Sequence, residues 1–100
     1  MMNQIVLVGR IAKIREEENN TIITLAIHRN YKNADGEYEI DFIDCQLFGE
    51  VAKTTIEYCQ SGDMVGIKGR LQVNNKKMIV VADRLTFLTT GYKKDDTEEE

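Results

Sequence analysis

Apolar and polar residues alternate along most of this chain, which is the period-two pattern of β-strands. Five runs carry the pattern, and polar or glycine-containing segments separate them: residues 3–14, 21–29, 38–48, 64–73 and 78–88. Both sides of the first run are apolar near its start, so we expect burial on both faces, with a bulge or bend at Gly9. Asp35-Gly36 and Asn74-Asn75 are turn signals, because Gly and Asn tolerate a positive φ.

The run over residues 38–48 predicts a strand whose two faces differ chemically. One face carries Ile43, Cys45 and Leu47, which are core residues by type. The other face has Asp44 and Gln46 among four large apolar side chains: Tyr38, Ile40, Phe42 and Phe48. The second face is therefore an aromatic surface that polar residues interrupt.

Residues 49–60 change to a helical pattern, with small or apolar residues at three- and four-residue spacing, and Ser61-Gly62 ends it. In the strand that follows, we expect four residues to face the core: Val65, Ile67, Leu71 and Val73. The order is therefore three strands, one helix and two strands. This order predicts an all-β protein with one helix, a five-stranded antiparallel OB-fold barrel with the helix between strands three and four.

The formal net charge of −4 at first argues against a nucleic-acid partner. Residues 93–100 contain two positive and five negative side chains, which leaves a charge of only −1 on residues 1–92. We therefore divide the chain into an OB-fold domain, residues 1–92, and a short disordered acidic tail, residues 93–100. No apolar run approaches the roughly 20 residues that span a bilayer, and two cysteines suit free thiols, so we expect a cytoplasmic protein with no membrane partner.

Proteins bind single-stranded nucleic acid with cations along the backbone and aromatic rings that stack on bases. The stacking candidates are Tyr31, Phe42 and Phe48. The candidates for phosphate contacts are basic residues at strand ends, hairpins and outward positions: Arg10, Arg29, Lys32, Lys68, Arg70, Lys76 and Lys77. On these residues alone an ordinary reading stays open, in which the two phenylalanines belong to the core and the cations to a solvated surface.

Other chemistries find little support in the sequence. His28 is the only histidine, and Cys45 and Cys59 stand 14 residues apart without a CxxC pair, so we expect no metal. Gly66 and Gly69 lack the pattern of a phosphate-binding loop. We expect neither a cofactor nor an enzyme activity.

Five blocks of the sequence closely resemble bacterial single-stranded DNA-binding proteins: residues 3–11, 25–31, 41–49, 62–71 and 80–88. The resemblance covers residues 3–88 and implies an OB-fold that assembles as a homotetramer and coats single-stranded DNA with little sequence preference. It also implies a role in DNA replication, recombination or repair. Tyr31, Phe42 and Phe48 fall where the family stacks aromatics, and four cations fall where it has basic or polar DNA-facing residues: Arg10, Arg29, Lys32 and Arg70. Phe87 has no such match and is assigned to the core; Tyr38 is left as surface.

The chain departs from the family pattern in three respects. It has no Trp, its hairpin over residues 72–77 is short, and residues 95–100 keep the acidic tip without the Pro-Phe-type pair that docks replication proteins. The missing Trp, the short hairpin and the nearly neutral charge of residues 1–92 favour an alternative, a primosome-type accessory module that acts mainly through protein partners. An RNA-binding OB domain is a third hypothesis, since it differs only in contacts to the 2′-hydroxyl.

Overall fold

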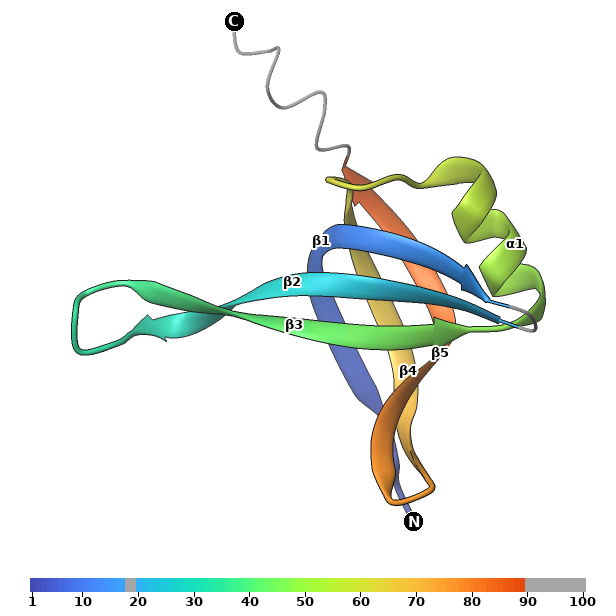
Figure 1. The fold of residues 1–100 in the computed structure, drawn as a ribbon, viewed down its shortest axis with the longest axis horizontal. Coiled ribbons are helices and arrows are strands. Elements are labelled where there is room, and N and C mark those ends of the chain that lie inside the picture. The colour runs from blue at the N-terminus through green and yellow to red at the C-terminus, as the bar shows by residue number, and fades with distance from the viewer. Residues whose placement is uncertain (18–19, 90–100) are drawn as a thin grey trace, which may run out of the picture.

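The computed structural model describes residues 1–17 and 20–89. Its elements follow the predicted order (Figure 1): β1 Ile5–Glu17, β2 Asn20–Lys32, β3 Tyr38–Leu47, α1 Gly49–Tyr58, β4 Met64–Asn74 and β5 Lys77–Thr89. The acidic tail predicted at residues 93–100, and the domain end at residue 92, lie outside the described residues. The expected all-β architecture with one helix is confirmed.

The five strands form a closed barrel in the order β1-β2-β3-β5-β4. Four of the five pairings are antiparallel, as expected. The closing pairing of β3 with β5 is parallel and short, with Cys45 opposite Val80 and Gln46 opposite Val81. Helix α1 lies at the end of the barrel where β3 ends (Figure 1). This is the predicted five-stranded OB-fold barrel with one parallel pair.

The core consists of small and medium aliphatic side chains from all five strands and α1: Ile11, Ile23, Leu25, Cys45, Leu47, Ala52, Val65, Ile67, Val80 and Ala82. Cys45 and Leu47 are fully buried, and Ile43 packs against the core, so the predicted inward face of β3 is confirmed. The outward residues Tyr38, Ile40, Phe42 and Phe48 are all exposed, so this face is also confirmed. Aromatic residues contribute nothing to the core among the described residues.

Strand β1 departs from the expectation at its bulge. The register against β2 shifts between Ile11 and Lys13, so the extra residue is Ala12 and not Gly9. At Gly9 the backbones of β1 and β2 instead come close together, because a Cβ on Gly9 would lie 2.8 Å from the Ala26 carbonyl oxygen. Val6 and Val8 are exposed, so the expected burial of both faces near the start of β1 is wrong for the single chain. A one-residue slip changes which residues face outward, so Lys13 and Arg15 take over the outward positions after Ala12.

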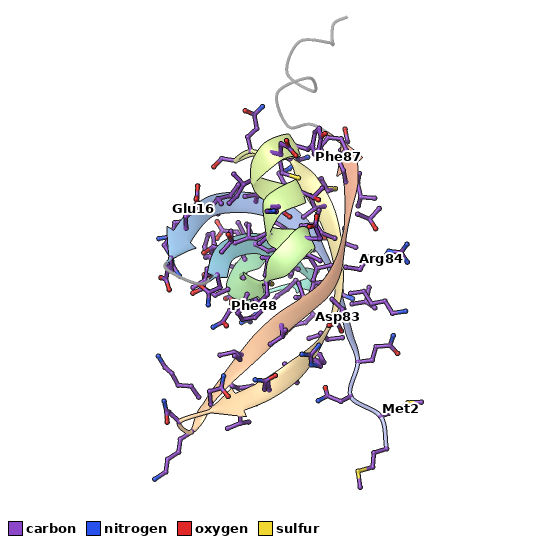
Figure 2. The ribbon with its side chains drawn as sticks, turned by 90° about the vertical axis from the view of Figure 1, so that its right-hand side faces the viewer. Met2, Glu16, Phe48, Asp83, Arg84 and Phe87 are labelled. Carbon is purple, nitrogen blue, oxygen red and sulfur yellow. The ribbon has the colours of Figure 1, made fainter. Side chains whose placement is uncertain are left out.

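Hairpin β4–β5 extends past the barrel (Figure 2). Its turn consists of Asn75 and Lys76, both with positive φ (51° and 66°), one residue later than the Asn74-Asn75 signal. Leu71 and Val73 were expected in the core but are exposed. Leu71 lies opposite Val80, where the barrel closes, and Val73 lies beyond that point on the hairpin. Phe87 is likewise exposed near the other end of β5, so its assignment to the core is wrong (Figure 2).

Hairpin β2–β3 extends from the barrel in a different direction from hairpin β4–β5 and forms a long arm (Figure 1). The Asn33 side chain holds its loop, because Oδ1 accepts hydrogen bonds from the backbone N–H groups of Asp35 (2.9 Å) and Glu37 (3.0 Å). Gly36 has a φ of 78°, as the Asp35-Gly36 signal predicts. Both hairpins therefore have well-formed turns although neither tip contributes to the core.

Two glycines of β4 test how closely the barrel is packed. A methyl group at Gly69 would overlap the Val81 carbonyl group and lie 3.1 Å from Ala82 Cα, whereas one at Gly66 would find its nearest neighbour, Val8 Cγ2, at 3.8 Å. We expect Gly69→Ala to lower the free energy of unfolding by about 1–3 kcal/mol. The control Gly66→Ala should stay within about 1 kcal/mol of the wild type. Urea denaturation measures both variants, and equal midpoints would contradict the close contact of Gly69 with the β5 backbone.

Candidate nucleic-acid interface

The outward residues of β2 and β3 form one continuous face. Directly opposed residues of antiparallel strands point to the same side, and the register places Ala26 opposite Phe42 and Thr24 opposite Asp44. The Phe42 side chain is 65% exposed on this face. We call the outward positions of β2 and β3 the aromatic face, after Tyr38 and Phe42, which flank Ile40 on it.

A groove of about 590 Å³ separates this face from hairpin β4–β5. We call it the hairpin groove. One wall comes from β1, β2 and β3: Arg15, Ile22, Phe42, Ile43, Asp44 and Gln46. The other wall comes from β4 and β5: Leu71, Lys77, Met78, Ile79 and Val80. It is a mixed surface, since an exposed phenylalanine and methionine adjoin two cations, a carboxylate and an amide.

The three predicted stacking residues occupy different parts of the molecule. Tyr31 is 61% exposed near the tip of the β2–β3 arm, Phe42 lines the hairpin groove, and Phe48 is 44% exposed just before α1. The backbone at Phe48 is still extended (φ −132°, ψ 159°), so the alternation of β3 continues to this residue. Phe42 and Phe48 therefore share an outward direction, about 20 Å apart along the strand at roughly 3.3 Å per residue.

The sequence analysis gave Tyr38 no role in binding, and the structure places its side chain on the surface of the β2–β3 arm. Its ring is exposed, and Lys32 Nζ lies 5.8 Å from the ring centroid, within the range of a cation–π contact. The register sets Lys32 directly opposite Tyr38. The signal in the sequence was the spacing, because Tyr38 lies four residues before Phe42 on the same face.

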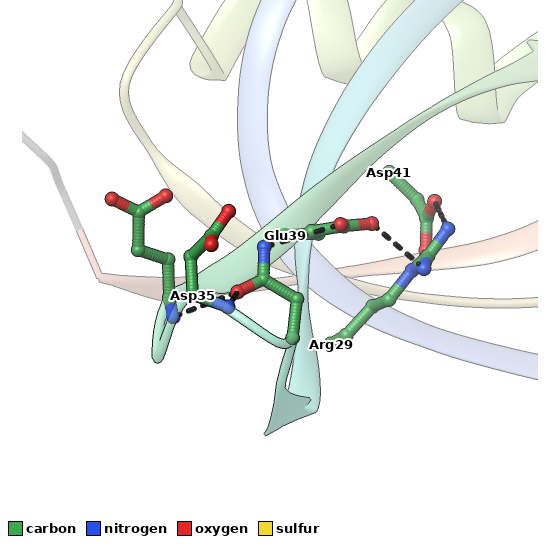
Figure 3. A network of polar contacts seen from close by, with 6 residues as sticks. Arg29, Asp35, Glu39 and Asp41 are labelled. Carbon is green, nitrogen blue, oxygen red and sulfur yellow. Dashed lines mark hydrogen bonds and ion pairs between the residues drawn. The ribbon is translucent and has the colours of Figure 1, made fainter.

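Arg29 lies within a network of carboxylates at the base of the arm (Figure 3). Its Nε and Nη2 donate to the two oxygens of Asp41 at 3.1 and 3.0 Å, and its Nη1 donates to Glu39 Oε1 at 2.9 Å. Glu39 also accepts a hydrogen bond from the Asn33 side chain at 3.2 Å. The bidentate bond from Arg29 lowers the pKa of Asp41, and the same bond raises the pKa of Arg29.

Two more of the predicted phosphate contacts are also engaged. Arg70 pairs with Asp83, and Arg10 donates from Nη1 to the Gly62 carbonyl oxygen at 3.0 Å. The structure brings Lys77 to the hairpin groove and places Lys76 beside it in the turn. Lys68 is exposed but lies elsewhere, in a cavity of about 420 Å³ that Arg84 and the first four residues also line. The predicted cations therefore form no single basic face.

Sequence reasoning missed three polar residues of the hairpin groove. Arg15, Asp44 and Gln46 line it, and Arg15 Nη2 lies 3.4 Å from Asp44 Oδ2. Gln46 and Asp44 were placed on the outward face of β3 by their alternation, so a signal for both existed. Arg15 gave none, because the bulge at Ala12 decides its direction.

The described residues offer little to other chemistries. No three His, Cys, Asp or Glu side chains of residues 1–17 and 20–89 gather in a way that could hold a metal ion. Burial raises the pKa of the Cys45 thiol to about 12 and also raises that of Cys59. Within these same ranges, no helix has the length and apolar character to cross a membrane.

The Arg29 network predicts a measurable pKa change. Asp41 has a lowered pKa in the folded chain, so this pair stabilises the fold above the ordinary carboxyl value of 3.8 and ceases to do so as the pH falls through the lowered value. In Arg29→Gln we expect the Asp41 pKa, followed by carboxyl-carbon NMR, to return towards 3.8. Arg15→Gln is the control, because Arg15 pairs with Asp44 instead. An unchanged Asp41 pKa in Arg29→Gln would refute the network.

Comparisons with known proteins agree with this architecture. The profile of the single-strand binding protein family matches residues 2–84. Single-stranded DNA-binding protein B of Bacillus subtilis is 40% identical over 103 residues, which cover 88% of this chain and 91% of that protein. Single-stranded DNA-binding protein 1 of Clostridium acetobutylicum is 37% identical over 105 residues, which cover 89% of this chain and 96% of that protein.

Other relatives are longer, and a solved structure shares the fold. Single-stranded DNA-binding protein 3 of Streptococcus agalactiae is 42% identical over 81 residues, and the match spans only 59% of its length. The crystal structure of a small single-stranded DNA binding protein from Mycoplasma pneumoniae superposes with a TM-score of 0.66 at 17% identity, and the match covers 100% of this chain and 99% of that chain. The profile match and the two relatives of similar length show that this chain belongs to the single-strand binding protein family.

Proposed function

We propose that this protein binds and coats single-stranded DNA, largely without sequence preference and without catalysing a reaction. The DNA would lie along the aromatic face and through the hairpin groove. Bases would stack on Tyr31, Phe42 and Phe48, and cations near them would contact phosphates. The names of the two relatives of similar length support this proposal, since both are single-stranded DNA-binding proteins.

The exposure of Phe42 is the observation that carries the proposal. A phenylalanine that is 65% exposed leaves most of an aromatic ring in water, while the core of this barrel is built from aliphatic side chains. A base stacked on the ring would remove this apolar surface from water, and stacking of this kind contributes about 1–3 kcal/mol per base. It tolerates any sequence, because every base has a π-face.

The cations divide into two groups by their present partners. Arg10, Arg29 and Arg70 already donate to carbonyl or carboxylate oxygens, so a phosphate would have to compete for them. The lysines are the better phosphate contacts: Lys32 on the arm and Lys76 and Lys77 at the tip of the β4–β5 hairpin. Lys68 faces another side of the barrel and would contact DNA only where the strand continues around the molecule.

Single strands arise in replication, recombination and repair, and we propose these cytoplasmic processes as the setting. The acidic residues 93–100 would remain outside the DNA-binding domain as a separate tail. The accessory-module alternative predicts a different result: a replication protein recovered in the absence of DNA, together with weak binding of oligonucleotides.

Fluorescence anisotropy with oligo(dT) and a duplex of equal length tests the proposal. We expect tight binding of oligo(dT) only, with an affinity that falls steeply as salt is added. Tyr31→Ala and Phe42→Ala should each weaken binding by about 1–3 kcal/mol without unfolding the chain, since both rings are exposed. Tyr58→Ala is the matched control, because Tyr58 is 72% exposed on α1, away from the groove. Equal binding of oligo(dT) and duplex would reject the proposal.

We also propose that the chain assembles as a homotetramer through β1 and its neighbours. Val6 and Val8 are exposed, and a Cβ on Gly66 would contact both Val8 (3.8 Å) and Leu88 (3.9 Å), so these side chains form one apolar patch. Residues 5–9 of β1 pair with β4 but not with β2, whose pairing begins at Arg10. A second copy would cover this patch and pair with the free edge.

Light scattering tests the assembly. We expect the mass of four chains of 11.5 kDa for the wild type. Val8→Glu should dissociate the assembly and leave the fold intact, because Val8 is exposed in the single chain. Val73→Glu is the control, since Val73 is also an exposed valine but lies on the β4–β5 hairpin. A wild-type mass of one chain would remove the proposal.

A further inference from the structure

Asp44 places a negative charge inside the hairpin groove. It lies two residues after Phe42 on the same outward face, and both residues line the groove. Its side chain is 56% exposed, so it faces solvent that a bound strand would replace. A carboxylate repels phosphates and so weakens the general attraction of this surface for DNA. It lies beside the exposed Phe42 ring, where the edge of a base stacked on that ring would come close to it.

The carboxylate of Asp44 has a fixed orientation. Thr24 lies directly opposite Asp44 in the β2–β3 register and is buried, and its Oγ1 donates to Asp44 Oδ1 at 2.6 Å. Arg15 approaches Oδ2 only at 3.4 Å, which leaves that oxygen able to accept a stronger hydrogen bond. An ionised carboxylate has only acceptors. The groove therefore presents a fixed acceptor about 7 Å along the strand from the Phe42 ring position.

We propose that Asp44 is a specificity-determining residue, which favours bases with an exocyclic amino group over thymine and uracil at the Phe42 stacking position. Cytosine offers its 4-amino group as a donor, whereas thymine and uracil present a carbonyl oxygen at the same place. The amino group would donate to Asp44 Oδ2, and the carbonyl oxygen would be repelled by it. Gln46, the next outward residue, does not discriminate in this way because its amide both donates and accepts.

The inference rests on the proposed function, and its test compares two oligonucleotides whose bases differ in the group at position 4 and in the proton at N3. Oligo(dC) and oligo(dU) of equal length are titrated at pH 8, where cytosine is neutral. The measured quantity is the ratio of the two affinities in the wild type and in Asp44→Asn. We expect the substitution to lower the preference for oligo(dC) by about 3- to 10-fold, the effect of one hydrogen bond and one avoided repulsion.

Two controls separate base contact from general charge. Glu37→Gln removes the same charge from the loop before β3, outside the groove, and should strengthen the binding of both oligonucleotides equally. Asp44→Asn in an Arg15→Gln background shows whether the change comes through Arg15, which Asp44 contacts. The shift in preference must persist in this double variant if Asp44 itself contacts the base. Loss of the shift there would overturn the inference.

The failures of the two proposals are distinguishable. If the wild type binds neither oligonucleotide, the proposed function fails. If all proteins bind but the affinity ratio changes less than twofold in Asp44→Asn, or equally in Glu37→Gln, the inference alone fails. Should Asp44→Asn not fold, the wild type is titrated with an oligonucleotide of pyrimidin-2-one, which has hydrogen in place of the 4-amino group. We expect a loss of about 3- to 10-fold against oligo(dC), and no loss would overturn the inference.

Discussion

Closure of the barrel is the constraint on which the rest of this structure depends. The closing contact between β3 and β5 contains only two residue pairs, Cys45 with Val80 and Gln46 with Val81. Next to this contact, β4 passes close to the Val81 and Ala82 backbone, where Gly69 has no side chain. The enclosed core is correspondingly small and aliphatic. Strands of 10 to 13 residues are longer than such a core can cover, so both hairpins continue beyond it (Figure 1).

The parts of the strands beyond the core supply the binding surface. A strand inside the barrel buries one of its faces, whereas the β2–β3 arm and the β4–β5 hairpin leave large side chains open to solvent, such as Tyr31 and Met78. The hairpin groove lies where the β4–β5 hairpin meets the outward face of the barrel, which carries Phe42. Its apolar residues suit the faces of bases and its lysine suits a phosphate. The fold and the proposed binding surface therefore have one cause, namely strands that are longer than the core they enclose.

The sequence predicted the features that depend on strict alternation. Along β3 the period of two holds from Tyr38 to Phe48, so Phe42 and Phe48 were placed outward correctly. Alternation fails to predict which side chains are buried wherever the register of a strand shifts or the strand extends beyond the barrel. The bulge at Ala12 sets the direction of Arg15, and the apolar Val73 alternates like a core residue although it lies past the core. Neither event has a local signal, because the first depends on the register between two strands and the second on where the barrel closes.

The ion pairs of Arg29 could not be predicted from the sequence for a similar reason. Arg29 reaches Asp41 and Glu39 across a register shift between His28 and Lys32. The central claim is that DNA follows the aromatic face and the hairpin groove, and a titration of the ¹⁵N-labelled protein with oligo(dT), followed by NMR, tests it most directly. The account predicts the largest amide shift changes at residues 38–48 and 71–78. Changes confined to α1 and the start of β1, with the groove residues unaffected, would contradict it.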